Sequence, residues 1–342
     1  MIRISRRSVL AGAAAATLSH PRSSFGQAVP ARVRFAVDFV WQSNHAIWTI
    51  AQDKAFFSDD KLNVSVDRGY GSSDNLTKLA AGALDIGLVD PNLLGKFNQE
   101  NPGSQMTAVF VVYDAAPSAA VYLKSSGIKA MKDIEGRKVA VTDGSANVPL
   151  FKALCQLNGV DASKIEFLSV SPALRDTMVI QKRADIAVGF FTTSVINMMA
   201  AGIPKDDIGY FQYSRHGLAL YSLCLVCKKD YCAANPETVA AFIRGTVKGT
   251  REMLADPKGA VASIMRRDGL LKENVELDRN ELMNDGCLVT PWVRQHGLSV
   301  VDRERFESTT GQVTELLGGR RPKMEDIYTD KLLPPQSERK VV

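Results

Sequence analysis

Residues 37–57, VDFVWQSNHAIWTIAQDKAFF, place several side chains suited to ligand binding where an apolar strand is expected to pass into a helix. They are a carboxylate, an indole, an amide and an imidazole, supplied by Asp38, Trp41, Asn44 and His45. The loop at the carboxyl end of a strand faces an open crevice, and helix N–H groups point into that crevice. We therefore predict a ligand site here. The alternative is simple packing, in which Asp38 caps the helix or His45 is a structural histidine.

Further candidates occupy the same position after other expected strands. Ser72 opens a helix that its hydroxyl can cap, Asp90 ends LDIGLVD ahead of a proline, and Ser145 in DGSANVP lies at a helix N-terminus. Plain capping without a ligand contact is the alternative for Ser72, and an ordinary Asp-Pro turn is the alternative for Asp90. The candidate set is completed by aromatic residues that form either an opposing wall of the pocket or part of the core, namely Phe190, Tyr70, Tyr113 and Tyr221.

These side chains must be positioned by strand-like and helix-like segments that alternate along the chain. VRFAVDF, a helix over about residues 46–57, LNVSVDRGY, a helix around residues 74–81 and LDIGLVD have the rhythm of a parallel α/β sheet. RKVAVTDGSANVPLFKALCQLNGV opens a second set that continues through IEFLSVS and ADIAVGFF. GLALYSLCLVCKKD is typical of a return strand, and periodic apolar positions predict helices after Pro236.

The length of the chain indicates two domains, because about 310 residues after the N-terminal leader exceed one ordinary core. The chain can leave the first lobe at AAPS, between two apolar stretches, and return before the strand near residue 220. We therefore predict an α/β protein in which residues 32–116 and 220–338 form lobe 1. Residues 117–219 are predicted to form lobe 2.

Residues 1–28 have the pattern of an export signal, with a charged start, an apolar run too short to span a bilayer and small residues before the mature chain. SRRSVL, with Arg6 and Arg7, resembles the twin-arginine (Tat) signal of proteins exported in folded form, with an ordinary Sec signal as the alternative. We therefore expect a soluble periplasmic protein that uses the Tat export machinery. The leader holds four arginines and no acidic residue, so the net charge of +5 falls to +1 beyond it, and no nucleic-acid partner is expected.

Three of the five cysteines, Cys224, Cys227 and Cys232, form a C-x2-C-x4-C cluster. Residues three apart in a strand face opposite sides of the sheet, and no fourth ligand stands at an obvious spacing. Buried thiols are therefore favoured over a metal site. A disulfide is the third alternative in an oxidising compartment, and the sequence alone does not assign one.

Several longer segments carry a family resemblance. GSSDNLTKLAAGALDIGLVD, GIKAMKDIEGRKVAVTDGSA, ADIAVGFFTTSV, NPETVAAFIRGTVKG and IYTDKLLP resemble the periplasmic substrate-binding proteins that include the thiamine-pyrimidine, taurine, alkanesulfonate and nitrate binders. The resemblance covers nearly all of residues 33–334. It implies the type II periplasmic-binding-protein fold, with two α/β lobes joined by two crossover strands and a ligand cleft between them. It also implies a small-molecule ligand, the permease and ATPase subunits of an ABC importer at the inner membrane as partners, no cofactor and no enzymatic activity.

The first strand and its loop resemble the branch that binds pyrimidine precursors of thiamine, in which this strand typically ends in D-W-x-P-N-x-N-H. Asp38, Asn44 and His45 match at identical spacing, whereas Trp41 replaces the proline and Gln42 the first asparagine. Because such a ligand is flat, Trp41 is expected to form an aromatic floor. Asp38 would accept from an exocyclic amine, and Asn44 and His45 would donate to ring nitrogens. The resemblance thus favours a hydroxymethyl- or formylaminopyrimidine ligand.

Three other functions stay open. A sulfonate, a nitrate-like anion or an aromatic carboxylate would need an arginine, and Arg175 in SPALRDTM is the candidate, unless it begins a solvent-facing helix. The fungal pyrimidine synthase of the same fold is an enzyme that consumes its own histidine and pyridoxal phosphate, and it carries a cysteine-dense iron motif with no counterpart in this sequence. A ligand-sensing subunit that docks on a membrane receptor would need the same fold.

Overall fold

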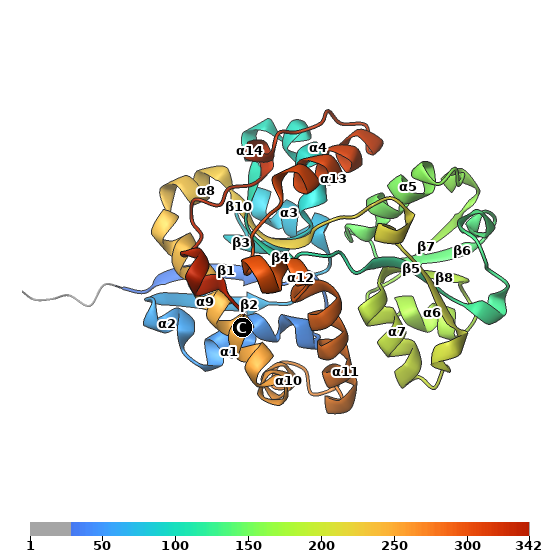
Figure 1. Cartoon of the computed structure of the whole chain (residues 1–342), viewed down its shortest axis with the longest axis horizontal. Coiled ribbons are helices and arrows are strands. Elements are labelled where there is room, and N and C mark those ends of the chain that lie inside the picture. The colour runs from blue at the N-terminus through green and yellow to red at the C-terminus, as the bar shows by residue number, and fades with distance from the viewer. Residues whose placement is uncertain (1–28, 342) are drawn as a thin grey trace, which may run out of the picture.

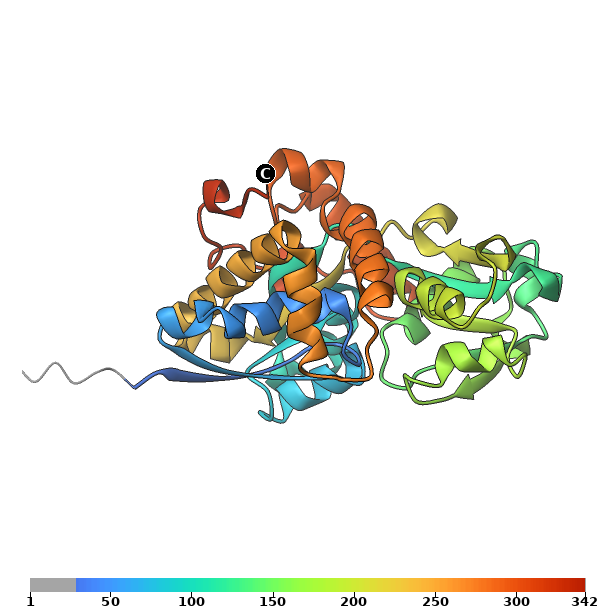
Figure 2. The same cartoon turned by 90° about the horizontal axis from the view of Figure 1, so that it is seen from below.

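The computed structural model describes residues 29–341, so the predicted export leader, residues 1–28, lies outside the described residues. Two lobes lie side by side along the long axis of the molecule, and each is built on its own five-stranded sheet (Figure 1). A view turned by 90° shows the same separation into a larger and a smaller lobe (Figure 2). Between residues 29 and 341, no helix has the length and apolar character needed to cross a membrane.

The sheet of lobe 1 has the strand order β2-β1-β3-β10-β4. Strand β1 pairs in parallel with β2 and β3, whereas β10 runs antiparallel to β3 and β4. The strands are β1 (Ala31–Ala36), β2 (Leu62–Asp67), β3 (Ile86–Val89), β4 (Met106–Tyr113) and β10 (Ser222–Lys228).

The sheet of lobe 2 repeats this arrangement, with the order β7-β6-β8-β5-β9. Strand β6 is parallel to β7 and β8, and β5 is antiparallel to β8 and β9. In each sheet the antiparallel inner strand is the one that directly follows a crossing between the lobes. The strands are β5 (Ser118–Leu123), β6 (Lys138–Val141), β7 (Glu166–Ser169), β8 (Ile186–Phe190) and β9 (Ile208–Gln212).

The chain crosses between the lobes twice, through residues 114–117 and residues 213–221. The two crossings are hydrogen-bonded to each other, because the N–H of Ala116 donates to the carbonyl oxygen of Leu220 at 3.0 Å. The lobe boundaries expected from the sequence, between residues 116 and 117 and between residues 219 and 220, stay a prediction. The predicted fold class, two α/β lobes joined by two crossing segments, is confirmed.

Helices cover both faces of each sheet (Figure 1). The helix predicted over residues 46–57 is two helices, separated where Ala55 has a positive φ of 63°. The helix predicted around residues 74–81 is α3, and the region after Pro236 is helical as expected. Lobe 1 contains α1 (Ala46–Asp53), α2 (Phe56–Asp59), α3 (Ser72–Ala80), α4 (Leu94–Glu100), α8 (Lys229–Ala234), α9 (Pro236–Ala255), α10 (Pro257–Met265), α11 (Glu273–Met283), α12 (Pro291–His296), α13 (Arg303–Leu316) and α14 (Met324–Ile327), and lobe 2 contains α5 (Asn147–Leu157), α6 (Arg175–Ile180) and α7 (Phe191–Ala200).

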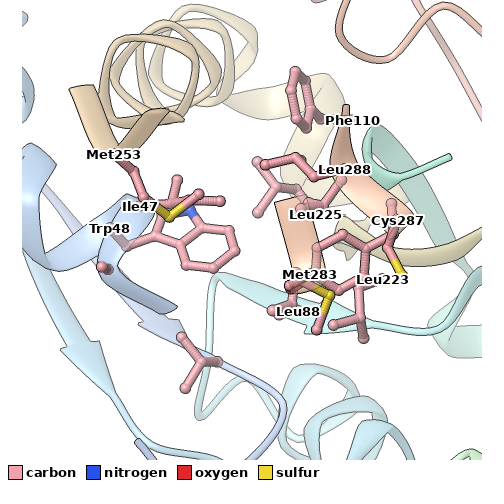
Figure 3. Close-up of a cluster of buried hydrophobic side chains, with 14 of the residues drawn as sticks. Ile47, Trp48, Leu88, Phe110, Leu223, Leu225, Met253, Met283, Cys287 and Leu288 are labelled. Carbon is pink, nitrogen blue, oxygen red and sulfur yellow. The ribbon is translucent and has the colours of Figure 1, made fainter. Parts of the chain in front are cut away.

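Strand alternation places apolar side chains on both faces of the lobe 1 sheet. On β10, Leu223 and Leu225 face one core cluster, while Cys224 faces the other. Figure 3 shows the first of these clusters, in which Trp48 of α1 and Leu288 of a π-helical turn lie with Leu225 and other apolar residues. Burying one large apolar side chain contributes on the order of 1.5–3 kcal/mol. This core therefore holds the carboxyl ends of β1 and β3 in place beside lobe 2.

Candidate ligand-binding site

A narrow cavity of about 30 Å³ lies between the two lobes. It is smaller than the roughly 300–1,000 Å³ of small-molecule sites, so the lobes must separate to admit a ligand. Its walls come from the loops at the carboxyl ends of β1, β2, β3, β6, β7 and β8, from the first turns of the helices that follow, and from Leu223 of β10. The lining residues from lobe 1 are Asp38, Phe39, Gln42, Asn44, His45, Gly71, Ser72, Asp90 and Leu223, and those from lobe 2 are Ser145, Ala146, Asn147, Arg175, Phe190 and Thr193.

The loop between β1 and α1 provides the polar end of the cavity. His45 Nε2 lies 3.1 Å from Asp38 Oδ1. Because a carboxylate oxygen only accepts, this contact places a proton on Nε2 and leaves Nδ1 as an acceptor when the ring is neutral. Asn44 Nδ2 donates to the Tyr113 hydroxyl at 3.0 Å.

The other polar side-chain atom of Asn44 and that of His45 are buried without a hydrogen-bond partner among the described residues. They are Asn44 Oδ1 and His45 Nδ1. Asn44 Oδ1 is an acceptor, and His45 Nδ1 is an acceptor when the ring is neutral, so these two atoms suit a ligand donor, and the donor role expected from the sequence stays a prediction. One N–H of the Asn44 amide is engaged by Tyr113 and the Nε2 proton of His45 by Asp38, so the second Asn44 N–H is the donor left to these two residues.

Asp90 is a second buried carboxylate at the cavity. Its Oδ1 accepts from the N–H and the amide Nδ2 of Asn92, at 3.0 and 2.7 Å, and its Oδ2 accepts from Ser222 Oγ at 3.0 Å. Burial raises the pKa of Asp90 to about 6, even though these hydrogen bonds favour the ionised form. Asp90 therefore caps the turn that begins at Pro91 and also adds negative charge to the cavity near neutral pH.

Ser72 lines the cavity but does not cap α3, so the capping role expected from the sequence is wrong. Gly71 precedes the helix, and no side chain caps its first turn. The Ser72 hydroxyl instead accepts from the N–H of Asp90 at 3.0 Å. This bond ties the start of α3 to the end of β3.

Lobe 2 contributes one cation, Arg175, which is buried rather than solvent-facing. Its Nε and Nη2 donate to the two carboxylate oxygens of Asp176 at 2.9 and 3.2 Å, and Nη2 also donates to Ser194 Oγ. Burial opposes the ionised form of Asp176, but the Arg175 charge and the hydrogen bonds from Arg175, Ser194 and Asn197 together hold its pKa below the usual range. The positive charge of Arg175 is thus balanced by its own neighbour.

The two walls meet through contacts between the lobes. Thr193 Oγ1 donates to Gln42 Oε1 at 3.0 Å, and the N–H of Ser73 donates to the carbonyl oxygen of Gly144 at 2.8 Å. Gly71 has a φ of +127°, and a Cβ atom built there would lie 2.3 Å from the same carbonyl oxygen. Only glycine therefore allows the lobes to approach this closely.

The aromatic faces of the cavity come from Phe39 and Phe190, not from Trp41. Trp41 is half-buried, packs against the core of lobe 1 and lies edge-on to His45, with a centroid distance of 6.3 Å. Phe191, next to Phe190, stacks on Tyr210. The structure thus separates the two adjacent phenylalanines into a cavity residue and a core residue.

The three predicted tyrosines also lie outside the lining. Tyr70 is 46% exposed beside Arg68. Tyr113 is buried behind Asn44, and Tyr221 is buried with its hydroxyl accepting from the N–H of Asp302 at 3.0 Å. Their positions near strand ends were readable from the sequence, but the direction of each side chain was not.

Asn147 and Thr193 are cavity residues that sequence reasoning missed. Asn147 lies inside the quoted DGSANVP segment, and its buried Oδ1 has no partner in residues 29–341. Thr193 follows ADIAVGFF directly, in the first turn of α7. A systematic choice of the polar residues in the first turn after each strand would have found both.

The cavity is rich in hydrogen-bond acceptors and carries excess negative charge. Asp38 and Asp90 line it, while the charge of Arg175 is balanced by Asp176. Buried polar atoms without a partner in the described chain add to this set, namely Asn44 Oδ1, His45 Nδ1 and Asn147 Oδ1. Since an unpaired buried polar group destabilises a protein by about 1–3 kcal/mol, the arrangement favours a ligand that supplies several N–H or O–H donors.

The cysteine cluster is only partly as expected. Cys227 and Cys232 form a disulfide that joins the end of β10 to α8, so the buried-thiol interpretation is wrong for these two residues. Cys224 is a buried free thiol, as predicted. Over residues 29–341, no group of three or more His, Cys, Asp or Glu side chains is placed to hold a metal ion.

Comparison with known proteins identifies related sequences. The family described as NMT1/THI5 like matches residues 42–260, more than half of the 342 residues. The chain is 22% identical over 231 residues to the formylaminopyrimidine-binding protein of Halalkalibacterium halodurans, covering 67% of this chain and 68% of that protein. It is 21% identical over 222 residues to the 4-amino-5-hydroxymethyl-2-methylpyrimidine phosphate synthase of Legionella pneumophila, covering 64% and 69% respectively.

Among solved structures, the alkanesulfonate-binding protein SsuA of Xanthomonas axonopodis pv. citri, bound to MOPS, has a similar fold. Its TM-score is 0.65 at 15% identity, over 90% of this chain and 96% of that one. This likeness concerns the fold alone, whereas the family match includes Gln42, Asn44 and His45 in the cavity. The chain therefore belongs to the NMT1/THI5-like family and has the fold of the periplasmic binding proteins.

Proposed function

We propose that the protein is the substrate-binding component of an ABC importer and that its ligand is a thiamine-type aminopyrimidine, of the hydroxymethyl- or formylaminopyrimidine kind. The observation that carries this proposal is the set of unpartnered buried acceptors beside two carboxylates. An exocyclic amine and a hydroxyl or formylamino N–H supply donors to such a set. The ring itself can stack on Phe39 or Phe190.

The main alternative is an anionic ligand such as a sulfonate, nitrate or an aromatic carboxylate. An oxyanion needs donors and a net positive field. Here the Arg175 charge is balanced by Asp176, and Asp38 and Asp90 would repel an anion. The charge distribution thus favours the aminopyrimidine over the anions.

Both a binding protein and a synthase occur among the relatives, so the enzymatic alternative has its own test. We propose that this chain binds its ligand without transforming it. Incubation with a pyrimidine should return the same compound by mass spectrometry. Formation of a pyrimidine product by the chain supplied with pyridoxal phosphate would establish the synthase instead.

The proposed setting is the periplasm, with permease and ATPase subunits at the inner membrane as partners and the Tat machinery as the export route. The disulfide between Cys227 and Cys232 supports an oxidising compartment. The leader that would direct export lies outside the described residues. Fractionation of cells that express the full chain, with antibody detection, tests the location.

A thermal-shift screen of the chain without residues 1–28 tests the ligand class. The panel contains 4-amino-5-hydroxymethyl-2-methylpyrimidine, formylaminopyrimidine, taurine, nitrate and an aromatic acid. A ligand present at about 100 times its Kd stabilises the fold by about 2.7 kcal/mol. A shift with the pyrimidines alone supports the proposal, and a shift with an anion alone overturns it.

A further inference from the structure

Helix α11 belongs to the C-terminal part of the chain and lies where lobe 1 meets lobe 2 (Figures 1 and 2). Its C-terminal end is anchored in lobe 1, because Met283 and the following Cys287 and Leu288 pack into the core cluster around Phe110 and Leu225 (Figure 3). Another side of α11 contacts α7 of lobe 2. The helix is therefore carried by lobe 1 and touches lobe 2.

Two charged residues of α11 are buried at this contact. Glu276 and Arg279 pair at 3.1 Å between Oε2 and Nε, and each side chain is 3% exposed. Arg279 reaches lobe 2, where Nη2 donates to Asn197 Oδ1 at 2.9 Å and Nη1 donates to the carbonyl oxygen of Thr193 at 3.3 Å. On the lobe 1 side, Glu276 Oε2 accepts from the N–H of Ser43 at 2.8 Å.

These contacts reach the outer side of both cavity walls without entering the cavity. Ser43 lies between the cavity residues Gln42 and Asn44 in the chain, and Thr193 lines the cavity and donates to Gln42. Asn197 also donates to Asp176, the partner of the cavity residue Arg175, at 2.6 Å. The pair on α11 is thus one hydrogen bond away from residues on each wall.

We propose that the Glu276–Arg279 pair is a latch that sets ligand affinity by holding lobe 1 against lobe 2. The inference rests on the proposed binding function, and it places an affinity-determining element outside the cavity and beyond residues 42–260 that the family match covers. Arg279 moves with lobe 1, so its bonds to Thr193 and Asn197 must break when the lobes separate. The latch therefore favours the closed arrangement and slows release of the ligand.

The test compares two latch variants with one matched control. Arg279→Met removes the bonds to lobe 2 but leaves Glu276 buried without a cation, which destabilises a fold. The double variant Glu276→Gln with Arg279→Met removes the charge from both residues and preserves the packing. The control is Arg294→Gln, an arginine that is 54% exposed and lies 3.7 Å from Asp285.

The ligand used as the probe is 4-amino-5-hydroxymethyl-2-methylpyrimidine, and its binding and release are followed by stopped-flow fluorescence. The latch predicts that koff rises by about tenfold to a hundredfold in the double variant, the range expected for hydrogen bonds from a charged donor, while kon changes little. The control should match the parent protein. An unchanged koff in the double variant overturns the latch and leaves the proposed function standing.

Failure of the parent protein to bind the probe contradicts the proposed function instead, and the latch is then judged on ligand-free protein. Single-molecule energy transfer between a dye on Lys258→Cys in lobe 1 and one on Lys129→Cys in lobe 2 measures the lobe separation. The latch predicts fewer closed molecules in the double variant than in the Arg294→Gln protein. Identical distributions in the two proteins overturn it.

Discussion

Replacing the buried carboxylate of Asp90 should make the protein more stable, and the gain should depend on pH. In Asp90→Asn the amide oxygen can still accept from Asn92, and Ser222 Oγ can rotate to accept from the new N–H. The substitution therefore removes a charge without removing its hydrogen-bonding partners. What it relieves is the burial of an ionised carboxylate.

The magnitude follows from the pKa of Asp90, which burial raises from the ordinary value of 3.8 to about 6. Between these two values the folded state binds more protons than the unfolded state, so this carboxylate lowers stability progressively as pH rises from about 4 to about 6. Above that range the loss is constant, at about 3 kcal/mol. Asp90→Asn should recover about this amount near pH 7.5 and less than about 1 kcal/mol near pH 4.

Urea unfolding of both proteins at the two pH values measures these free energies. Asn92→Asp is not a suitable control because it adds a charge, whereas Asp59→Asn removes an exposed carboxylate and should leave stability within about 0.5 kcal/mol. An Asp90→Asn protein that is no more stable than its parent near pH 7.5 would refute the reasoning. So would an equal gain at both pH values, because burial of the charge would then not be the cause.

Three further predictions concern the cavity, the lobe contact and export. Phe190→Ala should weaken pyrimidine binding by about fivefold to more than a hundredfold, the range for loss of one stacking partner. Trp41→Ala should weaken binding less. If calorimetry shows the reverse order, Trp41 and not Phe190 is the main stacking partner of the ligand. Gly71→Ala should reduce affinity at least tenfold, because its Cβ meets the facing lobe at 2.3 Å; an unchanged Kd would mean that closure does not need this contact. Lysine at both Arg6 and Arg7 should trap precursor in the cytoplasm, and normal periplasmic delivery on a fractionation blot would indicate Sec export.

The fold was predictable because its signals are local. The alternation of strands and helices, and the return strand in GLALYSLCLVCKKD, are patterns of hydrophobic periodicity that each segment carries alone. Much of the cavity lining, such as Asp38, Asp90 and Phe190, was predictable for a related reason. Residues at the carboxyl ends of parallel strands meet at one edge of a sheet, so topology brings them together whatever their neighbours are.

The errors concern the direction of side chains and partners from distant segments. Trp41 follows a strand, but it packs against a core cluster and is not among the residues that line the cavity. The bond from Asn44 to Tyr113 was not foreseen because Tyr113, on β4, is distant in the sequence. The disulfide of Cys227 depends on how α8 places Cys232 beside β10, which spacing alone does not determine.

The most direct test of the central claim, that an acceptor-rich cavity recognises the amino group of a pyrimidine, is a calorimetric comparison of two ligands. One is 4-amino-5-hydroxymethyl-2-methylpyrimidine, and the other is the same molecule without its amino group. The cavity leaves buried acceptors unpaired with the second ligand, so we expect its Kd to be about tenfold to a hundredfold weaker, equivalent to about 1–3 kcal/mol. Equal affinity for both compounds, or tighter binding of taurine than of either, would contradict the account.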